Sequence, residues 1–496
     1  MSQFDLLIIG GGINGAGIAR DAAGRGLSVL LVEQNDLASA TSSSSSKLIH
    51  GGLRYLEYYE FRLVAEALAE REVLLSIAPH IIWPLEFVLP HEPHLRPAWL
   101  IRLGLFLYDH IGGRSALPRS QGIALEADGH GAGLKPGFRR GFSYSDGWVD
   151  DARLVVANAR SAVQKGASVL PRTRCMAARR EAGAWRVTLS DGTGEREVTA
   201  RALVNAAGPW VKQVIDRQIG IGTRGKVRLV KGSHIVVPRI HDKRHAYILQ
   251  NPDRRIIFLI PYEREFTLIG TTDVAVADTE HHPEISADEI AYLCEAASRY
   301  TRRPVTAQNV LWAYSGVRPL YDDGSPDPSA VTRDYHFELD TGAGQQDAPL
   351  LSIFGGKITT YRKLAEHALE KLESWFPGTR AWTHTEVLPG GDFGGRDFQA
   401  VLADFRARRP DLDRQWLARL LRRHGTLADA VLGEAKTVTD LGESFGGGLY
   451  ERELRYLVDE EWAQEAADVL WRRTKCGLHM SPSERARVAE FMKALP

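Results

Sequence analysis

The chain has 496 residues, more than one ordinary domain holds, so we expect two to four domains. Hydrophobic residues make up 44% and charged residues 25%, a composition typical of a soluble globular protein, which excludes a disordered or fibrous one. Lys plus Arg and Asp plus Glu both number 62, and this balance gives no reason to expect a nucleic-acid partner.

Cysteine usage and the N-terminus narrow the class further. The three cysteines lie far apart, which excludes a disulfide scaffold and a cysteine-rich zinc or iron–sulfur site and fits a reducing compartment. The N-terminus lacks the basic region of a signal peptide, and no uncharged apolar run approaches the roughly 18 residues needed to cross a bilayer. We therefore expect a soluble or peripheral protein, with no metal in its site.

The first fifty residues predict a dinucleotide-binding βαβ unit. Apolar residues 6–9 stop at a glycine turn over residues 10–17 (GGGINGAG), a helical stretch follows, and apolar residues 28–32 end at Glu33. Strand, glycine turn, helix, strand and acid in this order are the signature of that unit. The motif does not by itself separate FAD from NAD.

The residues of this unit have expected roles. Gly10 would make the tight turn, Gly12 would let the backbone approach a pyrophosphate, and Gly15 would let the helix pack on the sheet. Asn14 lies in the same turn, and the pyrophosphate would bind at the helix N-terminus. Glu33, 18 residues after Gly15, is placed to accept hydrogen bonds from an adenosine ribose.

A serine-rich stretch, residues 39–46, has the composition of a flexible linker. It falls inside the nucleotide unit, however, and continues into residues 47–56 (KLIHGGLRYL). A linker does not need a Gly-Gly pair flanked by His, Arg and Tyr, so we favour a loop that lines a phosphate or a flavin. The cofactor contacts expected from this loop are Thr41, Ser42, Ser46, Lys47 and Leu48.

These residues resemble those of the FAD-dependent (aerobic) glycerol-3-phosphate dehydrogenases, within the wider family of D-amino-acid-oxidase-like flavoenzymes. The segments that carry the resemblance follow the family's order, and they are residues 10–17, 40–56, 144–153, 204–210, 231–238, 270–273, 314–320, 332–335 and 354–363. The resemblance implies FAD as the cofactor, sn-glycerol 3-phosphate as the substrate, and a membrane quinone, ubiquinone or menaquinone, as the electron acceptor.

Two later glycine segments extend the cofactor prediction. Apolar residues 203–206 run into small residues that, in flavoproteins of this kind, close the adenosine–pyrophosphate side, although a plain strand-to-turn join explains them equally well. A second glycine turn precedes a helix after residue 354, and its donors suit the electron-rich edge of a reduced flavin, a need that an NAD enzyme lacks. The cofactor residues expected here are Ala207, Gly208, Gly355, Gly356, Lys357 and Thr359.

Arginines are the expected anchors of the substrate, because their planar fork matches a phosphate bidentately. Arg318, which lies between a glycine and a proline, would hold the phosphomonoester together with Arg333 and Arg54. A structural salt bridge is the usual role of an arginine, and Asp334 keeps that alternative open for Arg333. Tyr55, beside Arg54, is also assigned to the substrate.

His50 and His234 are the candidates for a general base, because imidazole has an unperturbed pKa of about 6.5. A buried structural histidine is the commoner role; the resemblance places both residues near the substrate, and we prefer neither. Thr272 and Asp273 follow apolar residues 266–269, so they fall at a strand end where active-site groups gather, and we assign them to the substrate. The catalytic set is therefore His50, His234, Arg54 and Lys357.

Residues 94–114 (HLRPAWLIRLGLFLYDHIGGR) form an apolar stretch interrupted by arginines, too short and too charged to span a bilayer. The residues alone do not decide between a helix in the membrane interface and an internal helix. The resemblance favours the membrane, since family members pass electrons to a lipid-soluble quinone. Beyond residue 391 the pattern changes to amphipathic helices. The basic stretch at 396–424 is either a solvated face of these helices or a surface that adds to membrane binding or to a subunit contact.

We therefore expect an α/β protein with a Rossmann-like FAD-binding domain, an inserted antiparallel-sheet substrate domain of the D-amino-acid-oxidase-like kind, and a C-terminal helical cap domain. The boundaries are residues 1–80, 151–225 and 350–388 for the FAD-binding domain, 81–150 and 226–349 for the substrate domain, and 389–496 for the cap. A homodimer is the default expectation.

The expected reaction is oxidation of sn-glycerol 3-phosphate to dihydroxyacetone phosphate. The arginines would hold the phosphate while hydride passes from C2 to flavin N5 and a histidine takes the hydroxyl proton. A quinone would reoxidise the flavin at the inner face of the cytoplasmic membrane, to which the cytoplasmic protein binds peripherally. The alternatives are an oxidase that uses O2, an amino-acid oxidase, and a non-catalytic membrane-bound flavin or lipid-headgroup sensor.

Overall fold

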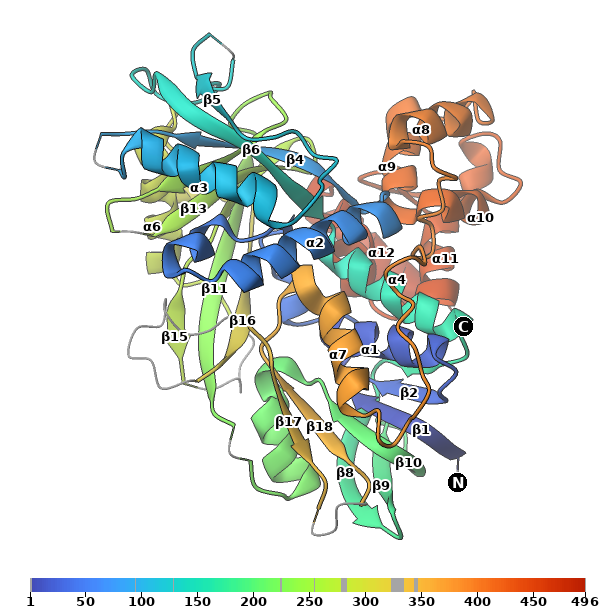
Figure 1. Ribbon diagram of the computed structural model, residues 1–496. Coiled ribbons are helices and arrows are strands. Elements are labelled where there is room, and N and C mark those ends of the chain that lie inside the picture. The colour runs from blue at the N-terminus through green and yellow to red at the C-terminus, as the bar shows by residue number, and fades with distance from the viewer. Residues whose placement is uncertain are drawn as a thin grey trace.

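The computed structural model describes residues 2–93, 95–127, 129–223, 225–253, 255–277, 283–322, 334–342 and 347–495. Two large sheets and a C-terminal helical region make up this part of the chain (Figure 1). Arg333, one of the arginines expected to bind phosphate, lies outside the described residues.

The first sheet has the parallel core that a dinucleotide-binding unit requires. Its order is β17–β18–β10–β1–β2–β7, with β9 paired to β10 and β8 paired to β9. Its strands are β1 (Ser2–Ile9), β2 (Val29–Val32), β7 (Ser168–Leu170), β8 (Arg174–Glu181), β9 (Ala184–Ser190), β10 (Glu195–Asn205), β17 (His336–Asp340) and β18 (Leu350–Phe354). Residues 6–9 of β1 and all four residues of β2 are buried, because both faces of this sheet are covered.

Three helices cover one face of the first sheet. They are α1 (Ile13–Gly24), α4 (Asp151–Gln164) and α7 (Tyr361–Lys371), and their apolar sides share one core with β1 and β2. Asn158 on α4 donates a hydrogen bond of 2.9 Å to the hydroxyl of Tyr361 on α7, which joins the helices inside that core. Strands β8 and β9 and the π-helical turn Val214–Ile219 cover the opposite face.

The second sheet is almost entirely antiparallel. Its order is β15–β11–β14–β13–β12–β4–β6–β3, with β16 paired to β11 and β5 paired to β6, and only β4 and β12 run parallel. Its strands are β3 (Leu48–Ile49), β4 (Ile82–Pro90), β5 (Gln121–Ala124), β6 (Arg140–Val149), β11 (Val227–Pro238), β12 (Ala246–Gln250), β13 (Ile256–Tyr262), β14 (Phe266–Gly270), β15 (Val274–Val276) and β16 (Trp312–Tyr321).

Helices pack on both faces of the second sheet. The helices α2 (Phe61–Ile77) and α3 (Ala98–Ile111) share one apolar core with β4 and β6, and α6 (Ala287–Tyr300) shares another with β11 and β12. No helix in the described ranges has both the length and the apolar character needed to cross a bilayer.

Two strands lie outside the expected domain boundaries. Strand β17 pairs with β18 in the first sheet, although its residues were assigned to the substrate domain, and β3 pairs with β6 in the second sheet, although it was assigned to the FAD-binding domain. Strand β3 pairs with residues about 100 positions away, and β17 pairs with a strand only 10 to 18 positions away. In both cases the apolar pattern of the strand itself does not identify its partner.

The C-terminal region is helical, as predicted. It contains α8 (Phe398–Ala407), α9 (Arg414–His424), α10 (Ala428–Leu432), α11 (Glu451–Glu461) and α12 (Pro482–Lys493), with a small hairpin of β19 (Ser444–Gly446) and β20 (Leu449–Tyr450). Figure 1 shows these orange-to-red helices gathered beside α4. Buried ion pairs anchor them there, because Arg153 on α4 binds Glu461 and Asp36 binds Arg473.

Candidate functional site

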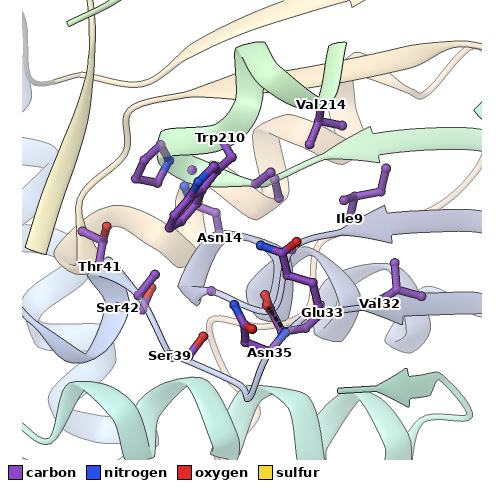
Figure 2. Close-up of a pocket in the computed structure, with 18 of the residues that line it drawn as sticks. Ile9, Asn14, Val32, Glu33, Asn35, Ser39, Thr41, Ser42, Trp210 and Val214 are labelled. Carbon is purple, nitrogen blue, oxygen red and sulfur yellow. Dashed lines mark hydrogen bonds between the residues drawn. The ribbon is translucent and has the colours of Figure 1, made fainter. Parts of the chain in front are cut away.

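The carboxyl ends of the parallel strands meet at one edge of the first sheet and enclose a cavity of about 480 Å³. Ile9 and Val32 end β1 and β2 there, and Figure 2 shows them with Glu33, Thr41 and Trp210 around the cavity. This edge is where open α/β sheets bind their ligands, since the loops that follow parallel strands converge on it.

The glycines of the first turn are required by close backbone contacts. Gly10 has φ of +114°, in the left-handed region, and a Cβ on it would lie 2.5 Å from the carbonyl oxygen of Ala206. A Cβ on Gly15 would lie 1.9 Å from the carbonyl oxygen of Gly10, so only glycine lets α1 pack this closely. Gly12 lines the cavity, and a Cβ on it would meet Ser42 Oγ at 3.1 Å.

Polar groups at the start of α1 face the same cavity. Ser42 Oγ accepts a hydrogen bond of 2.9 Å from the amide of Ile13, in the first turn of the helix. Asn14 donates from Nδ2 to the carbonyl of Gly355 at 3.1 Å, while its buried Oδ1 has no hydrogen-bond partner among the described residues. A buried acceptor without a partner next to an open cavity fits a bound ligand that donates a hydrogen bond.

Glu33 is held by backbone amides at the end of β2. Its two carboxylate oxygens accept hydrogen bonds from the amides of Gly11, at 2.7 Å, and Asn35, at 2.8 Å. Burial raises the pKa of Glu33, and these amide hydrogen bonds oppose that rise. The carboxylate therefore lines the cavity in a fixed orientation, where its remaining lone pairs suit ribose hydroxyls.

Most of the expected cofactor residues line this cavity. They are Gly10, Gly12, Asn14, Glu33, Thr41, Ser42, Ala207, Gly208, Gly355 and Gly356. The other expected residues, which are not part of its lining, are Gly15, Ser46, Lys47, Leu48, Lys357 and Thr359. Residues 173–175 also line the cavity without having been predicted, because only the tertiary fold brings the start of β8 beside β2.

Lys47 is directed away from the cavity. Its side chain is fully buried, and Nζ binds Asp151 at 2.7 Å and the carbonyl of Ser43 at 2.7 Å. Asp151 begins α4 and also accepts a hydrogen bond from Ser45 Oγ at 2.7 Å. Lys47 therefore holds the serine loop against α4, and its side chain does not contribute to the lining of the cavity.

The serine loop also reaches the second sheet through His234. His234 lies on β11 and is buried; its Nε2 is 2.9 Å from Ser46 Oγ, and its ring stacks on Tyr314 with 4.9 Å between centroids. Burial lowers the pKa of His234 well below 6.5, and the charges of Lys47 and Arg318 lower this pKa further. The imidazole is therefore neutral at pH 7, and Nδ1 has no hydrogen-bond partner in the described part of the chain.

Arg318, on β16, forms an ion pair with Asp273 and donates to Thr271 Oγ1 at 3.1 Å. Thr272 is buried; it donates to Glu289 at 2.7 Å and accepts from the amide of Ser233 at 2.9 Å. Of the two residues expected at this strand end, Asp273 thus orients Arg318, and Thr272 joins the strand to α6.

The late glycine turn adjoins the His50 segment. Lys357 Nζ lies 3.9 Å from the centroid of the Tyr55 ring, and the amide of His50 donates to Thr359 Oγ1 at 3.2 Å. The fold thus brings together residues about 300 positions apart in the sequence. Arg54 lies in the same segment, is half-buried, and has no ion-pair or hydrogen-bond partner within the described ranges.

A parallel sheet with a nucleotide-sized cavity at its carboxyl edge, joined to a large antiparallel sheet, defines a dinucleotide-binding protein of the α/β class. Residues 5–362 match the model of the FAD dependent oxidoreductase family, and residues 381–495 match that of the C-terminal domain of alpha-glycerophosphate oxidase. The chain belongs to the FAD-dependent oxidoreductases. Its cofactor is FAD, as predicted, and the cavity, the glycine contacts and the free acceptor of Asn14 fit that group.

Relatives match almost the whole chain. The aerobic glycerol-3-phosphate dehydrogenase of Escherichia coli (strain K12) is 55% identical over 99% of this chain and 98% of its own length. The D-erythritol 1-phosphate dehydrogenase of Brucella abortus (strain 2308) is 52% identical over 98% and 97%. The structure of the glycerol-3-phosphate dehydrogenase from Bacillus halodurans complexed with FAD is similar with a TM-score of 0.74 and 27% identity, over 99% of this chain and 94% of that one. The resemblance and the fold class predicted from the sequence are confirmed.

Proposed function

We propose that this protein oxidises sn-glycerol 3-phosphate to dihydroxyacetone phosphate and passes the electrons to a membrane quinone, ubiquinone or menaquinone. The observation that carries this proposal is the 55% identity, along almost the whole chain, with an aerobic glycerol-3-phosphate dehydrogenase. Bound FAD supplies the acceptor for the hydride that leaves the substrate carbon. The protein's own contribution is to bind the phosphate, orient the carbon and remove a proton.

Arg54 and Arg318 are the proposed phosphate ligands. A guanidinium offers five N–H donors in one plane, which matches the oxygens of a phosphomonoester. The ion pair with Asp273 fixes the orientation of Arg318, and Arg54 has no competing partner in the described chain. Arg333 stays in the proposal on the sequence motif alone, with Tyr55 beside Arg54 as the fourth contact.

His50 is the proposed acceptor of the hydroxyl proton, and His234 is the proposed hydrogen-bond partner that orients the hydroxyl. The distinction rests on charge, since burial and the cations of Lys47 and Arg318 disfavour the imidazolium form of His234. A neutral imidazole whose Nδ1 lacks a partner can still donate one hydrogen bond to a substrate or accept one from it. Lys357, in the late glycine turn, would stabilise the negative charge that reduction adds to the cofactor.

The apolar surface of α3 supports peripheral binding to the inner face of the cytoplasmic membrane. Trp99 is 69% exposed and Phe106 is 50% exposed, whereas Leu105 and Tyr108 on the same helix are buried against the second sheet. The neighbouring turn Leu53–Tyr58 and the start of α2 add three exposed aromatic side chains, namely Tyr58, Tyr59 and Phe61. An amphipathic helix with exposed aromatic residues binds at a membrane interface, where a quinone is accessible.

Oxidation of D-erythritol 1-phosphate is the second candidate function. A relative with this name is 52% identical over 98% of the chain, almost as similar as the glycerol-3-phosphate dehydrogenase. Both substrates are phosphomonoesters of polyols, so the same arginines would bind either one. The two candidates differ in the length of carbon chain that the site must accommodate.

An anaerobic titration tests the proposal. The flavin absorbance of the purified FAD-loaded protein should bleach on addition of sn-glycerol 3-phosphate and recover on addition of a short-chain quinone. A much higher kcat/KM for D-erythritol 1-phosphate than for sn-glycerol 3-phosphate, measured with the quinone as acceptor, would favour the second candidate instead. Recovery with O2 as fast as with quinone, accompanied by hydrogen peroxide, would favour the oxidase alternative. A flavin that neither phosphate ester bleaches would contradict both substrates.

A further inference from the structure

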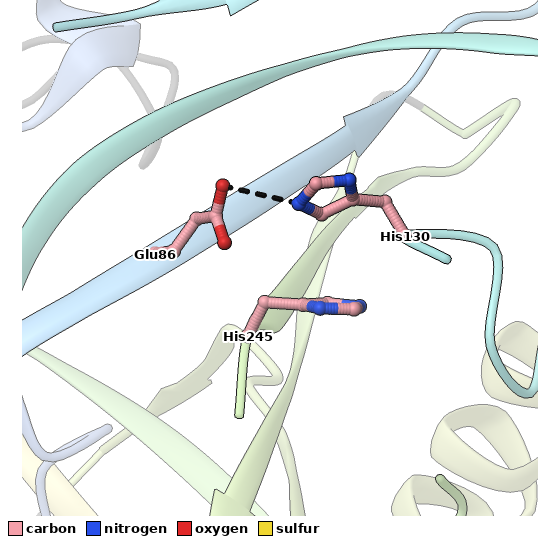
Figure 3. A group of neighbouring side chains, drawn as sticks. All are labelled: Glu86, His130 and His245. Carbon is pink, nitrogen blue, oxygen red and sulfur yellow. Dashed lines mark hydrogen bonds and ion pairs between the residues drawn. The ribbon is translucent and has the colours of Figure 1, made fainter. Parts of the chain in front are cut away.

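Two histidines and a glutamate meet on the second sheet, at a place that the reaction above does not use (Figure 3). Glu86 lies on β4, His245 immediately precedes β12, and His130 lies in the connection that follows β5. One ligand atom from each residue lies within 4.8 Å of the ligand atoms of the other two. Among the residues that the structure describes, this is the group of His, Cys, Asp and Glu side chains close enough to share a metal ion.

The register of the sheet brings Glu86 and His245 together. Strands β4 and β12 run parallel, with Phe87 opposite Ala246 and Val88 opposite Tyr247. Glu86 immediately precedes Phe87, and His245 immediately precedes Ala246, so the two residues lie opposite each other. Because residues in register point to the same face of a sheet, the two side chains are neighbours on the face that α6 covers.

Hydrogen bonds from the sheet hold His130 beside them. The hydroxyl of Tyr247 donates to the carbonyl oxygens of His130, at 2.5 Å, and Ala132, at 2.7 Å. The amide of Gly131 donates to the carbonyl of Leu125 at 2.7 Å, which closes the turn. As a result His130 Nε2 lies 3.2 Å from Glu86 Oε1.

Each of the two histidines has one buried ring nitrogen without a hydrogen-bond partner in the described chain. His245 is 5% exposed, and its Nε2 is buried with no hydrogen-bond partner in the described chain; the same holds for Nδ1 of His130. Leaving a buried imidazole nitrogen unsatisfied costs free energy, and it calls for an explanation in a native protein. A metal ion is the partner that two imidazoles and a carboxylate share most readily.

We propose that Glu86, His130 and His245 bind a zinc-class divalent ion, which ties the turn at residues 129–134 to the second sheet. Two imidazoles and one carboxylate form the protein ligand set of a tetrahedral zinc site whose fourth position is open to water. Bond lengths of about 2.0–2.2 Å place neighbouring ligand atoms of such an ion about 3.3–3.6 Å apart. The present ligand atoms lie within 4.8 Å of one another, so small side-chain rotations bring them to these distances. The Glu86 side chain is 40% exposed and provides the path of entry.

Zinc binding to the FAD-loaded full chain tests this site. Protein treated with a chelator and then dialysed against zinc should retain one zinc ion per chain, measured by mass spectrometry, and magnesium should not replace it. His130→Ala and Glu86→Gln remove a ligand, so each should weaken zinc binding by at least the roughly tenfold loss that changes in outer-shell partners cause. His479→Ala is the matched control, because His479 also lies 3.2 Å from a glutamate, Glu265, but belongs to no such group in the described chain.

A second measurement separates binding at this site from zinc bound elsewhere. Zinc should raise the midpoint of thermal unfolding of the wild-type and His479→Ala proteins, but not that of His130→Ala, because an ion that binds only the folded site stabilises it. The flavin content of all variants should stay unchanged. If His130→Ala fails to fold, the same thermal measurement on Glu86→Gln tests the site. Equal zinc affinity in wild type, His130→Ala and Glu86→Gln, or less than one zinc per wild-type chain at micromolar zinc, would overturn the proposal.

Discussion

Arg54 is the proposed substrate ligand whose role a single substitution tests most cleanly. Its side chain has no hydrogen-bond or ion-pair partner in the described ranges, so Arg54→Ala breaks no polar contact and should leave the thermal midpoint and the flavin content nearly unchanged. Hydrogen bonds to charged groups contribute about 1.5–3 kcal/mol, so KM for the phosphate ester should rise roughly 10- to 100-fold. Steady-state kinetics with a quinone acceptor give this value.

The matched control for this substitution is Arg62→Ala. Arg62 lies on α2 with 77% of its side chain exposed, and it pairs with Asp334 at 2.9 Å on the surface. We expect its KM to equal that of the wild type. Arg54→Lys should fall between the two, since it keeps the charge and loses the planar fork. An unchanged KM in Arg54→Ala would remove Arg54 from the phosphate site.

Substitution of Gly15 tests whether close packing of α1 on the sheet is needed for FAD binding in the cavity. A Cβ at this position would lie 1.9 Å from the carbonyl oxygen of Gly10, so α1 would have to move off the sheet. Overpacking of this kind costs about 1–3 kcal/mol, and it displaces the helix start that faces the cavity. Gly15→Ala should therefore lower both the flavin-to-protein ratio and the thermal midpoint.

Gly104 provides the comparison for Gly15, because it is also helical but has open space where a Cβ would lie. Gly104→Ala should retain FAD and be as stable as the wild type or more so, since alanine is favoured over glycine in helices by up to about 1 kcal/mol. Equal flavin content in both variants would show that close packing of α1 is not what retains the cofactor.

Helix α3 is the element on which the membrane proposal depends. Replacing Trp99 and Phe106 together by alanine removes two exposed aromatic side chains and leaves the buried Leu105 and Tyr108 in place. Burying such a side chain contributes about 1.5–3 kcal/mol, so the double variant should bind anionic lipid vesicles at least tenfold more weakly in a flotation assay.

Val438→Ala controls for the loss of exposed apolar area in general. Val438 is 47% exposed and lies in the C-terminal region, away from α3. We expect this variant to bind vesicles like the wild type. Anaerobic bleaching by substrate should be unaffected in the α3 variant, because the helix does not line the cavity. Wild-type vesicle binding by the double variant would contradict the role assigned to α3.

Buried charges join the C-terminal region to the rest of the molecule. Glu461 binds Arg153 of α4, and its Oε1 lies 3.8 Å from His424 Nδ1. Despite the opposing effect of burial, the charge of Arg153 lowers the pKa of Glu461 to about 2. The charge of Arg423 and the hydrogen bond with His424 likewise lower the pKa of Glu453 to about 2. Both pKa values are lower than in the unfolded chain, so their contribution to stability is complete above about pH 4.5.

We expect the free energy of unfolding to fall as the pH drops from about 4.5 to about 2, because in this range the two carboxylates bind protons in the unfolded chain while they remain ionised in the folded protein. At pH 7, Glu461→Gln leaves buried cations unpaired and should lower the free energy of unfolding by about 3–5 kcal/mol. Urea denaturation at several pH values measures both effects.

Glu460→Gln is the control next to Glu461 in the sequence. Glu460 is exposed and pairs with Arg160 at 3.1 Å, and a surface pair of this kind contributes about 0–1 kcal/mol. Equal losses in the two variants would mean that burial of the Glu461 ion pair does not hold the C-terminal region in place.

Local patterns determined the cofactor half of the site. The glycine spacing from residue 10, the acid at residue 33 and the late Gly-Gly turn are each short, and each carries a backbone requirement that few other folds impose. The role of Lys47 was less accessible, since its partner Asp151 lies 104 residues away and a lysine in a loop is compatible with solvent, phosphate or an ion pair.

Sequence motifs were enough to predict the family, the cofactor and the three-part architecture, because the members of each motif are neighbours in the chain. The folded structure was needed to show which sheet β3 and β17 join, that Thr272 donates a hydrogen bond to Glu289, and that Glu86, His130 and His245 meet. These features arise from strand register and tertiary packing, in which the partner residues lie from 10 to more than 100 positions apart and carry no local signal of one another.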